Sequence, residues 1–488
     1  MILSRIIIGF VGNASGIKGC RRKKVRCKLL AKGLFFKATV YFFVLFILSN
    51  FSLANKTIYV DDNGPADFNN IQAAMDDSND GDIVLVAPGT YTGEGNRDID
   101  FMGKAITVKS EYGPESCIIK CGGSYPGGDR LNPIEPEYHR GFYFHSNEDA
   151  NSIVQGFTVT EGYMGPYSGG AFLCTESSPA IRDCIIVGNS ATIGGGICAS
   201  FSDIRVENCV IKENIASFYP WDWFYGSADS GAAGGICVSS GNALLMNCLV
   251  VGNAASSQGG GIVCGHGDHQ IINCTVTDNR TGEGGIGGGI SIGTGIGYES
   301  YLHNSIVYRN LSDKNGNNIE LSYLGINFVM RLNVSNSLIE EDPNSIYDPS
   351  AQISGDWLST EPMFARNGYW DPNGTSEDLS DDFWVDGDYH LKSQAGRFDP
   401  NTQIWVQDDV TSLCIDTGDP NSPIWLEPFP NGGYINMGAY GGTSEASKSY
   451  FGKPVCQTIV AGDINGDCRV DLLDMEIMLL HWLEDNNP

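Results

Sequence analysis

The chain has 488 residues, of which 62 are glycine, and its 58 acidic residues outnumber its 30 basic residues to give a formal net charge of −28. This charge balance excludes a general affinity for nucleic acid and disfavours anionic lipid surfaces. The glycine content exceeds the usual share of about 7% but follows no collagen period, so we expect many tight turns, as an all-β repeat protein requires.

Residues 1–54 are predicted to be a signal peptide. They hold ten basic residues and no acidic one, followed by the apolar stretch Ala38–Leu48, which is short for a membrane span. Ser52 and Ala54 place small residues at the −3 and −1 positions of a cleavage site before Asn55. We therefore expect a secreted or cell-surface protein whose mature chain has 20 basic and 58 acidic residues, a net charge of −38. Contact with a membrane is expected only in the alternative case, where this segment stays uncleaved as an anchor.

The stretch Phe68–Asp80 is predicted to contain a helix, because Ile71, Ala74 and Met75 follow a helical spacing. In a solenoid the first coil exposes an open sheet edge that needs a cover. We expect this helix to cap the N-terminal end, and the strand-like sequence GDIVLVAPGTYTG that follows it to enter the first coils.

A repeat with spacings of 25 and 26 residues, longer where loops are inserted, occupies the middle of the chain. Each copy has a small residue, an apolar residue three positions before it, another two positions after it, and an asparagine five positions after it. The small residues are Cys184, Cys209, Cys248, Cys274 and Ser305, and the asparagines are Asn189, Asn214, Asn253, Asn279 and Asn310. Weaker copies extend the array upstream through Phe157 and downstream through Ser337.

This repeat predicts a right-handed parallel β-helix. Apolar residues two positions apart indicate a strand, and a coil of about 25 residues with several short strands is one rung of such a solenoid. Stacking of the rungs would align identical residues into an aliphatic ladder, an inward-facing thiol ladder, and an asparagine ladder whose amides bond to one another. Cys117 and Cys121, four residues apart in a strand, would lie about 13 Å apart, beyond the reach of a disulfide.

The segments IYVDDNG, IQAA, GDIVLVAPGTY and GKAITVKS, the repeats, and CIDTGDP with INMGAYGGT (Cys414 to Thr443) together resemble the secreted pectate-lyase-like β-helix family of bacteria. The resemblance covers residues 56–445, which we predict to form one β-helix domain with a cap and a closing segment. It implies a fold rather than an activity, because this family is defined better by its fold. A linker is expected over residues 446–460.

Three loops, Glu161–Ser168, Ala216–Ser230 and Arg280–Gly285, leave the predicted coils on the same side. Six of the eight residues from 218 to 225 are aromatic, and a soluble protein rarely exposes so much aromatic surface without a partner. We predict a polysaccharide or cell-surface glycan stacked on these rings; a small aromatic core within the loop is the alternative. The predicted ligand-binding residues are Tyr163, Tyr167, Trp221, Trp223, Tyr225, Arg280 and Glu283.

Two functional classes remain open from the sequence. The first is a glycan-binding surface protein, and the second is a polysaccharide lyase or glycoside hydrolase that acts along the same face. A glycoside hydrolase needs two facing carboxylates, and 58 acidic residues offer no distinguished pair. The sequence therefore assigns no catalytic residue, and the lack of a recognisable catalytic set favours the first class.

Residues 461–488 are predicted to form a calcium-binding loop and a helix. The sequence GDINGDCRVDLLD has the spacing of oxygen ligands typical of a calcium loop, and the helix that follows resembles a dockerin. Two features depart from that pattern: Cys468, which can pair with Cys456, replaces a glycine, and there is one loop where dockerins have two. A solvated acidic loop is the alternative to calcium, and a cohesin-like partner follows if the tail acts as a dockerin. The predicted ligands are Asp463, Asn465, Asp467, Asp471 and Asp474, with the backbone carbonyl of Arg469.

Overall fold

The computed structural model describes residues 55–124, 136–217, 231–293, 297–321, 331–349, 352–375, 382–452, 462 and 470–481. The chain divides into two compact units, Met1–Asn55 and Lys56–Pro488. The predicted signal peptide over residues 1–54 lies outside the described residues. No helix within the described ranges combines the length and the apolarity that a membrane crossing requires.

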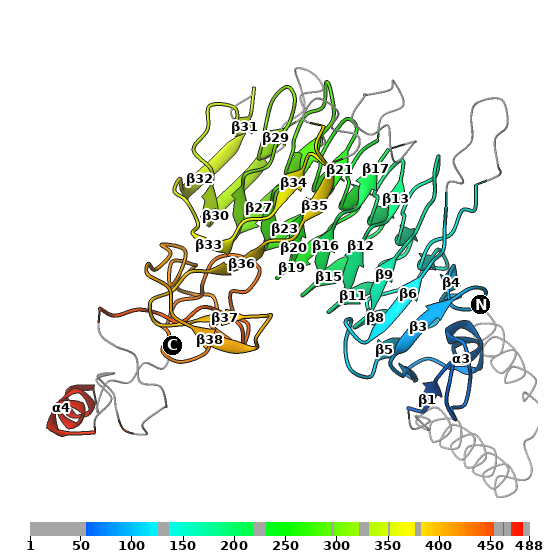
Figure 1. Ribbon diagram of the computed structural model, residues 1–488, viewed down its shortest axis with the longest axis horizontal. Coiled ribbons are helices and arrows are strands. Elements are labelled where there is room, and N and C mark those ends of the chain that lie inside the picture. The colour runs from blue at the N-terminus through cyan, green and yellow to red at the C-terminus, as the bar shows by residue number, and fades with distance from the viewer. Residues whose placement is uncertain are drawn as a thin grey trace, which may run out of the picture. The chain divides into compact units, whose positions relative to one another are not determined.

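The described residues between 56 and 358 wind into a parallel β-solenoid whose coils follow one another in chain order (Figure 1). Each coil contributes strands to three ladders, and the third ladder has nine strands, so that the solenoid has about nine turns. The first ladder consists of β1 (Thr57–Val60), β2 (Ile83–Val86), β5 (Thr107–Ser110), β8 (Ile153–Gln155), β11 (Ala180–Arg182), β15 (Arg205–Glu207), β19 (Leu244–Met246), β23 (Gln270–Ile272), β27 (Glu299–His303), β30 (Arg331–Ile339) and β32 (Ile353–Leu358).

A second and a third ladder, together with one short ladder, complete the coils. The second ladder consists of β3 (Gly89–Thr92), β6 (Cys117–Lys120), β9 (Thr158–Thr160), β12 (Ile185–Val187), β16 (Val210–Lys212), β20 (Leu249–Val251), β24 (Thr275–Thr277), β28 (Ile306–Tyr308) and the end of β30. The third consists of β4 (Ile99–Asp100), β7 (Phe142–Phe144), β10 (Phe172–Thr175), β14 (Ile197–Ser200), β18 (Ile236–Ser240), β22 (Ile262–His266), β26 (Ile290–Ile292), β29 (Ile319–Leu321) and β31 (Ile346–Tyr347). The short ladder consists of β13 (Ser190–Ala191), β17 (Ile215–Ala216), β21 (Ala254–Ala255) and β25 (Arg280–Thr281).

The register of the strands confirms the repeat alignment. Ile181 pairs with Val206, which pairs with Leu245, and the same pairing continues through Ile271, Leu302 and Val334. These side chains are almost completely buried, because alternate residues of each short strand point into the solenoid. The predicted all-β parallel solenoid is therefore confirmed.

Two bends in each coil require a left-handed backbone residue. The first bend, between the first and second ladders, uses asparagine or aspartate, which tolerate this conformation better than other side chains. At the second bend, just before the asparagine ladder, some coils have glycine, as at Gly188 and Gly252, whose φ angles are positive. Residues at the first bend have φ angles near 50° and are called here the bend row: Asp183, Asn208, Asn247, Asn273, Asn304 and Asn336.

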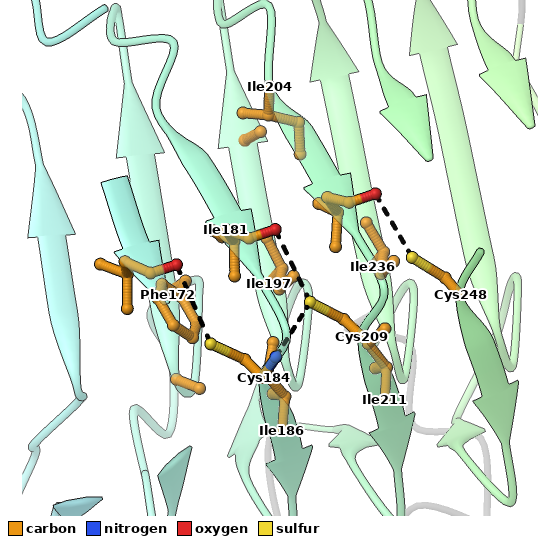
Figure 2. Close-up of a cluster of buried hydrophobic side chains, with 14 of the residues drawn as sticks. Phe172, Ile181, Cys184, Ile186, Ile197, Ile204, Cys209, Ile211, Ile236 and Cys248 are labelled. Atoms are coloured by element: carbon orange, nitrogen blue, oxygen red, sulfur yellow. Dashed lines mark hydrogen bonds between the residues drawn. The ribbon is translucent and has the colours of Figure 1, made fainter. Parts of the chain in front are cut away.

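The interior holds the two polar ladders that the sequence predicts. The thiols of the repeat are buried and unoxidised, and Figure 2 shows Cys184, Cys209 and Cys248 stacked beside the aliphatic core, with Cys209 Sγ accepting from the backbone N–H of Cys184 at 3.4 Å. Each asparagine amide donates to the side-chain oxygen of the next at 2.8–3.0 Å. The ladder runs from Asn189 through Asn310 to Asn318, one residue beyond the predicted set.

Helix α3 (Ile71–Asp77) forms where the sequence predicts a helix. Asn70 caps it, with Oδ1 accepting the backbone N–H of Ala73 at 2.8 Å. Its apolar side chains Ile71, Ala74 and Met75 are buried, and the helix contacts β1, β2 and β4. That it serves as the cap of the solenoid stays a prediction.

The described residues between 359 and 452, called here the C-terminal segment, pack on the outer side of the coils. Their apolar side chains, among them Tyr389, Leu391 and Met437, join Leu249, Ile306 and other outward residues of the second ladder in one cluster. The segment contains three antiparallel strand pairs: β33 (Phe364–Arg366) with β36 (Asp388–Leu391), β34 (Tyr369–Asp371) with β35 (Phe383–Val385), and β37 (Arg397–Asp399) with β38 (Ile404–Val406). The helix α4 (Leu472–His481) follows in the tail.

Candidate functional site

The bend row fixes the C-terminal segment to the later coils. The Asn247 amide donates to the carbonyl oxygens of Ala439 and Gly441 at 3.1 and 2.6 Å. Asn273 donates in the same way to the carbonyl oxygen of Asn436 at 3.1 Å. The INMGAYGGT sequence therefore lies along the bend row, and its backbone carbonyls are the acceptors for successive amides of the row.

The earlier part of the row is open to solvent. Asn208 is exposed, and its amide donates to Asp183 Oδ1 at 3.1 Å. A cavity of about 890 Å³ lies beside Asn208, between the coils and the C-terminal segment. The coil wall includes Glu115, Asn208, Val210, Met246 and Leu249, and the segment wall includes His390, Phe398, Gln403, Trp425, Tyr440 and Glu445. This cavity is called the groove below.

Trp425 is the most exposed aromatic side chain of the groove, with 53% of its surface accessible. Its backbone has φ 42°, a left-handed conformation that is strained for a bulky residue and is found more often at functional sites. A Cβ atom at Gly442 would lie 2.6 Å from Cε3 of the indole, so only glycine allows the ring to lie there. The indole is therefore held in place before any ligand arrives.

The segment wall also carries a chain of charged side chains. His390 Nδ1 lies 2.7 Å from Asp388 Oδ1, and its Nε2 lies 3.3 Å from Glu445 Oε2. Burial opposes the charged form of this imidazole, but the two carboxylates outweigh it and raise the pKa of His390. The ring also stacks on Tyr440, with 3.7 Å between the centroids. Because His390 is buried between carboxylates, Glu445 and Glu115 are the acidic groups that the groove presents to a ligand.

Behind the groove, Glu427 supports the loop that carries Trp425. It is 8% exposed, and its Oε1 accepts the backbone N–H groups of Asn436 and Gly442, both at 2.8 Å. Burial raises the pKa of Glu427 to about 7, although these two hydrogen bonds act in the opposite direction. This carboxylate thus titrates near neutral pH while it binds the backbone beneath Trp425.

The tyrosines of the predicted loop face lie together. Tyr163 is 6% exposed and stacks on Tyr138 with 5.8 Å between the centroids, whereas Tyr167 is 55% exposed and meets the same ring edge-on at 5.4 Å. The sequence did not single out Tyr138, which joins them. The predicted residues Trp221, Trp223 and Tyr225 lie outside the described residues.

The interactions of Arg280 and the position of Glu283 differ from those of the tyrosines. Arg280 is 7% exposed, its guanidinium lies 3.7 Å from the ring centre of Trp370, and it pairs with Asp382 at 2.7 Å. Burial lowers the pKa of Arg280 to about 10, against the effect of Asp382. Glu283 is exposed in the turn that follows β25. Arg280 therefore holds the C-terminal segment, and binding of a ligand by these loop residues stays a prediction.

The predicted calcium loop falls largely outside the described residues, where Asp463, Asn465, Asp467 and Arg469 lie, together with both cysteines of the proposed Cys456–Cys468 pair. The other two proposed ligands lie at the start of α4, Asp471 immediately before the helix and Asp474 in its first turn. Asp474 is 2% exposed, and its Oδ2 accepts the backbone N–H of Asp471 at 2.8 Å. Within the described ranges, no group of three or more His, Cys, Asp or Glu side chains is arranged to hold a metal ion.

No family model matches the sequence, and no curated protein matches it either. Among solved structures, the chain is similar to pectate lyase Pel9A, with 17% identity over 80% of this chain and 97% of that one and a TM-score of 0.33. It is similar to a pectin methylesterase from Aspergillus niger, with 14% identity over 64% and 93% of the two chains and a TM-score of 0.28. A pectin methylesterase in complex with a hexasaccharide gives 12% identity, coverage of 67% and 85%, and a TM-score of 0.32. The assignment to the parallel β-solenoids rests on the strand pairing of this chain itself.

Proposed function

We propose that the protein binds a polysaccharide in the groove between the open part of the bend row and the C-terminal segment. The observation that carries the proposal is Trp425, an indole that lies over Gly442 and is half exposed in a cavity of about 890 Å³. A flat aromatic ring with about half of its surface exposed suits the apolar face of a sugar ring. Nearby amides such as Asn208 and Gln403 supply hydrogen bonds to hydroxyl groups.

The charge of the groove indicates the class of polysaccharide. Glu115 and Glu445 line it, and Asp388 and Glu445 lie against the two ring nitrogens of His390. The chain as a whole is strongly acidic. An acidic groove repels a polyuronate, so the proposed ligand is a neutral or amino-sugar polysaccharide. The groove, rather than the loop face of Tyr163 and Tyr167, is the primary proposed site.

The test of this proposal is retention on polysaccharides by affinity electrophoresis, with neutral, amino-sugar and uronate polymers in parallel. Trp425→Ala should weaken binding to the retained polymer about tenfold or more, because a stacking contact is lost. Tyr434→Ala is the matched control, since Tyr434 is 47% exposed in the same segment but does not line the groove. Equal binding by wild type and Trp425→Ala would refute the proposal.

A second candidate, a glycoside hydrolase, is favoured by the placement of Glu115 and Glu445 on the two walls of one groove. Two carboxylates flanking a sugar are the catalytic pair that glycoside hydrolysis requires. Separate Glu115→Gln and Glu445→Gln variants should each abolish the release of reducing ends while retention on the polymer persists. If the wild-type protein releases no reducing ends from any polymer that it binds, binding is left as the function.

We also propose that residues 461–488 bind calcium and attach the protein to a surface or partner, as the spacing of oxygen ligands in the sequence indicates. The buried carboxylate of Asp474, which accepts the backbone N–H of Asp471, supports the proposal. Calcium titration of the full chain followed by calorimetry should show one site, which Asp463→Ala removes. Identical titrations of the two proteins would contradict a site in the tail. A cohesin-like partner and secretion remain predictions from the sequence.

A further inference from the structure

A second cavity, of about 550 Å³, lies on the last coils of the solenoid. It shares no lining residue with the groove. Strand β32 forms one side of it, through Gly355, Asp356 and Trp357, and β30 contributes Ser335. Among the described strands, β32 pairs only with β30, so that its other edge presents unpaired backbone groups.

Ser335 and His303 occupy the same position in successive coils. They are register partners in β30 and β27, each immediately before a left-handed asparagine of the bend row. Stacking therefore brings the hydroxyl to the imidazole, and Ser335 Oγ lies 2.8 Å from His303 Nδ1. At this position the earlier coils carry other side chains, Arg182, Glu207, Met246 and Ile272.

The C-terminal segment supplies a carboxylate on the far side of the same imidazole. Asp419 Oδ2 lies 3.3 Å from His303 Nε2. The backbone N–H of Asp419 donates to Asn304 Oδ1 at 2.8 Å, so the bend row itself positions this residue. Backbone hydrogen bonding from Asn421, assisted by His303, lowers the pKa of Asp419, which keeps it ionised. A second hydroxyl, Ser422 Oγ, lies 3.5 Å from the same Nε2.

We propose that Ser335, His303 and Asp419 form a site for acyl transfer from a short-chain carboxylic ester. The three groups have the order of a nucleophile, a general base and an orienting carboxylate. Relative to the usual arrangement the two ring nitrogens exchange roles, with the hydroxyl on Nδ1 and the carboxylate on Nε2. This exchange changes the tautomer but not the path of the proton. Ser335 is exposed to the cavity, whereas the side chain of His303 is 23% exposed.

The reaction balances with water as the co-reactant. Ser335 Oγ forms a bond to the ester carbonyl carbon while its proton passes to His303 Nδ1. The carbon–alkoxide bond then breaks, the alkoxide takes that proton, and an acyl-serine remains. Water gives a proton to His303 and attacks the acyl-serine, which releases the carboxylic acid and restores the hydroxyl. Backbone N–H groups at the outer edge of β32 are the candidate donors to the oxyanion.

Two measurements on the full chain test this site. The first is labelling by a fluorophosphonate probe, which reacts with activated serines, followed by mass spectrometric mapping; we expect the label on Ser335. The second is hydrolysis of p-nitrophenyl acetate, which Ser335→Ala should lower at least about 100-fold. Asp419→Asn should lower the rate and shift its pH profile, because the imidazole loses its carboxylate partner.

Ser354→Ala is the matched control, because Ser354 is an exposed hydroxyl on β32 that bonds to Asn333 rather than to an imidazole. Its labelling and hydrolysis should equal those of wild type. A wild-type protein that takes no label, or a Ser335→Ala variant that retains hydrolysis, overturns the proposal. Because the cavity is separate from the groove, neither result bears on polysaccharide binding, and retention of Ser335→Ala on the polymer shows that the variant is folded.

Discussion

The open and the covered parts of the bend row, called here its open end and its covered end, compare directly at Asn208 and Asn273, which share one backbone conformation and one side-chain type. Asn208 and Asn273 have φ angles of 55° and 50° at equivalent bends. Asn273 is buried under the C-terminal segment and donates to a backbone carbonyl, whereas Asn208 faces solvent at the groove. The comparison teaches that the repeat builds a uniform outer surface, and that the segment folded back on it decides which part is an anchor and which part is a site.

Buried charges also lie between the coils and the segment at the covered end. Arg280 with Asp382, and Asp278 with Arg309 and Tyr389, join the coils to the segment. Burial raises the pKa of Asp278, which shows that its charged form is poorly solvated there. Paired charges of this kind cost much when one partner is removed. The covered end should therefore respond strongly to substitution, and the open end weakly.

The largest expected effect is that of Arg280→Ala, which leaves the 3%-exposed carboxylate of Asp382 without its guanidinium. Loss of one partner of a buried pair destabilises by about 3–5 kcal/mol. Lys212→Ala is the control, because Lys212 pairs with the half-exposed Asp386 and should cost less than about 1 kcal/mol. Urea unfolding measures both variants. Equal costs would contradict the assignment of Arg280 as an anchor.

The next effect separates the two ends of the bend row. Asn273→Ala and Asn208→Ala carry the same strain of alanine in a left-handed conformation, so this strain cancels in the difference between them. Asn273→Ala should cost about 1–3 kcal/mol more, because the buried carbonyl of Asn436 loses its donor. Hydrogen exchange of the amides at 436–441 should accelerate only in Asn273→Ala. Unchanged exchange in that variant would mean that apolar packing alone holds the segment.

The third prediction concerns pH at the edge of the groove. The folded-state pKa of Glu427, about 7, is raised above the ordinary value of 4.5, so the folded protein binds this proton more tightly than the unfolded chain. The stabilisation is present at low pH and is lost as pH rises through 7, by on the order of 2 kcal/mol between pH 5 and 8. Glu427→Gln should remove this part of the pH dependence. Parallel stability curves for the two proteins over that range would show that Glu427 is not the group responsible.

The smallest effect is expected inside the solenoid, where both ends are alike. Cys274→Ser should cost less than about 1 kcal/mol, since its register neighbour is already Ser305, whose hydroxyl donates to the carbonyls of Ile271 and His303. A serine at 274 finds the equivalent carbonyls of Leu245 and Ile272, which Cys274 Sγ contacts now. Thermal unfolding checks this. A loss of several kcal/mol would show that the thiol ladder depends on sulfur packing rather than on size.

The sequence predicted what repeats along the chain. The apolar positions, the thiols and the asparagine ladder are set by contacts between one coil and the next, and each copy of the motif specifies the same local environment. Helix α3 was predicted for a similar reason, since the helical spacing of Ile71, Ala74 and Met75 is local. Asn318, the ladder residue that the sequence did not predict, also makes a local contact, because it lies only eight residues from Asn310.

The candidate sites depend on pairings that no local pattern contains. Trp425 meets Asn208 across the groove from more than two hundred positions away, and Asp419 reaches His303 across more than a hundred. The sequence showed the motifs CIDTGDP and INMGAYGGT but not the surface on which they lie, and it did not show the ion pair of Arg280 with Asp382. Sequence alone determined the solenoid, because its energy is a sum of neighbouring contacts. Only the tertiary structure decided the groove and the Ser335 cavity, because they form where the returning chain covers some coils and leaves others open.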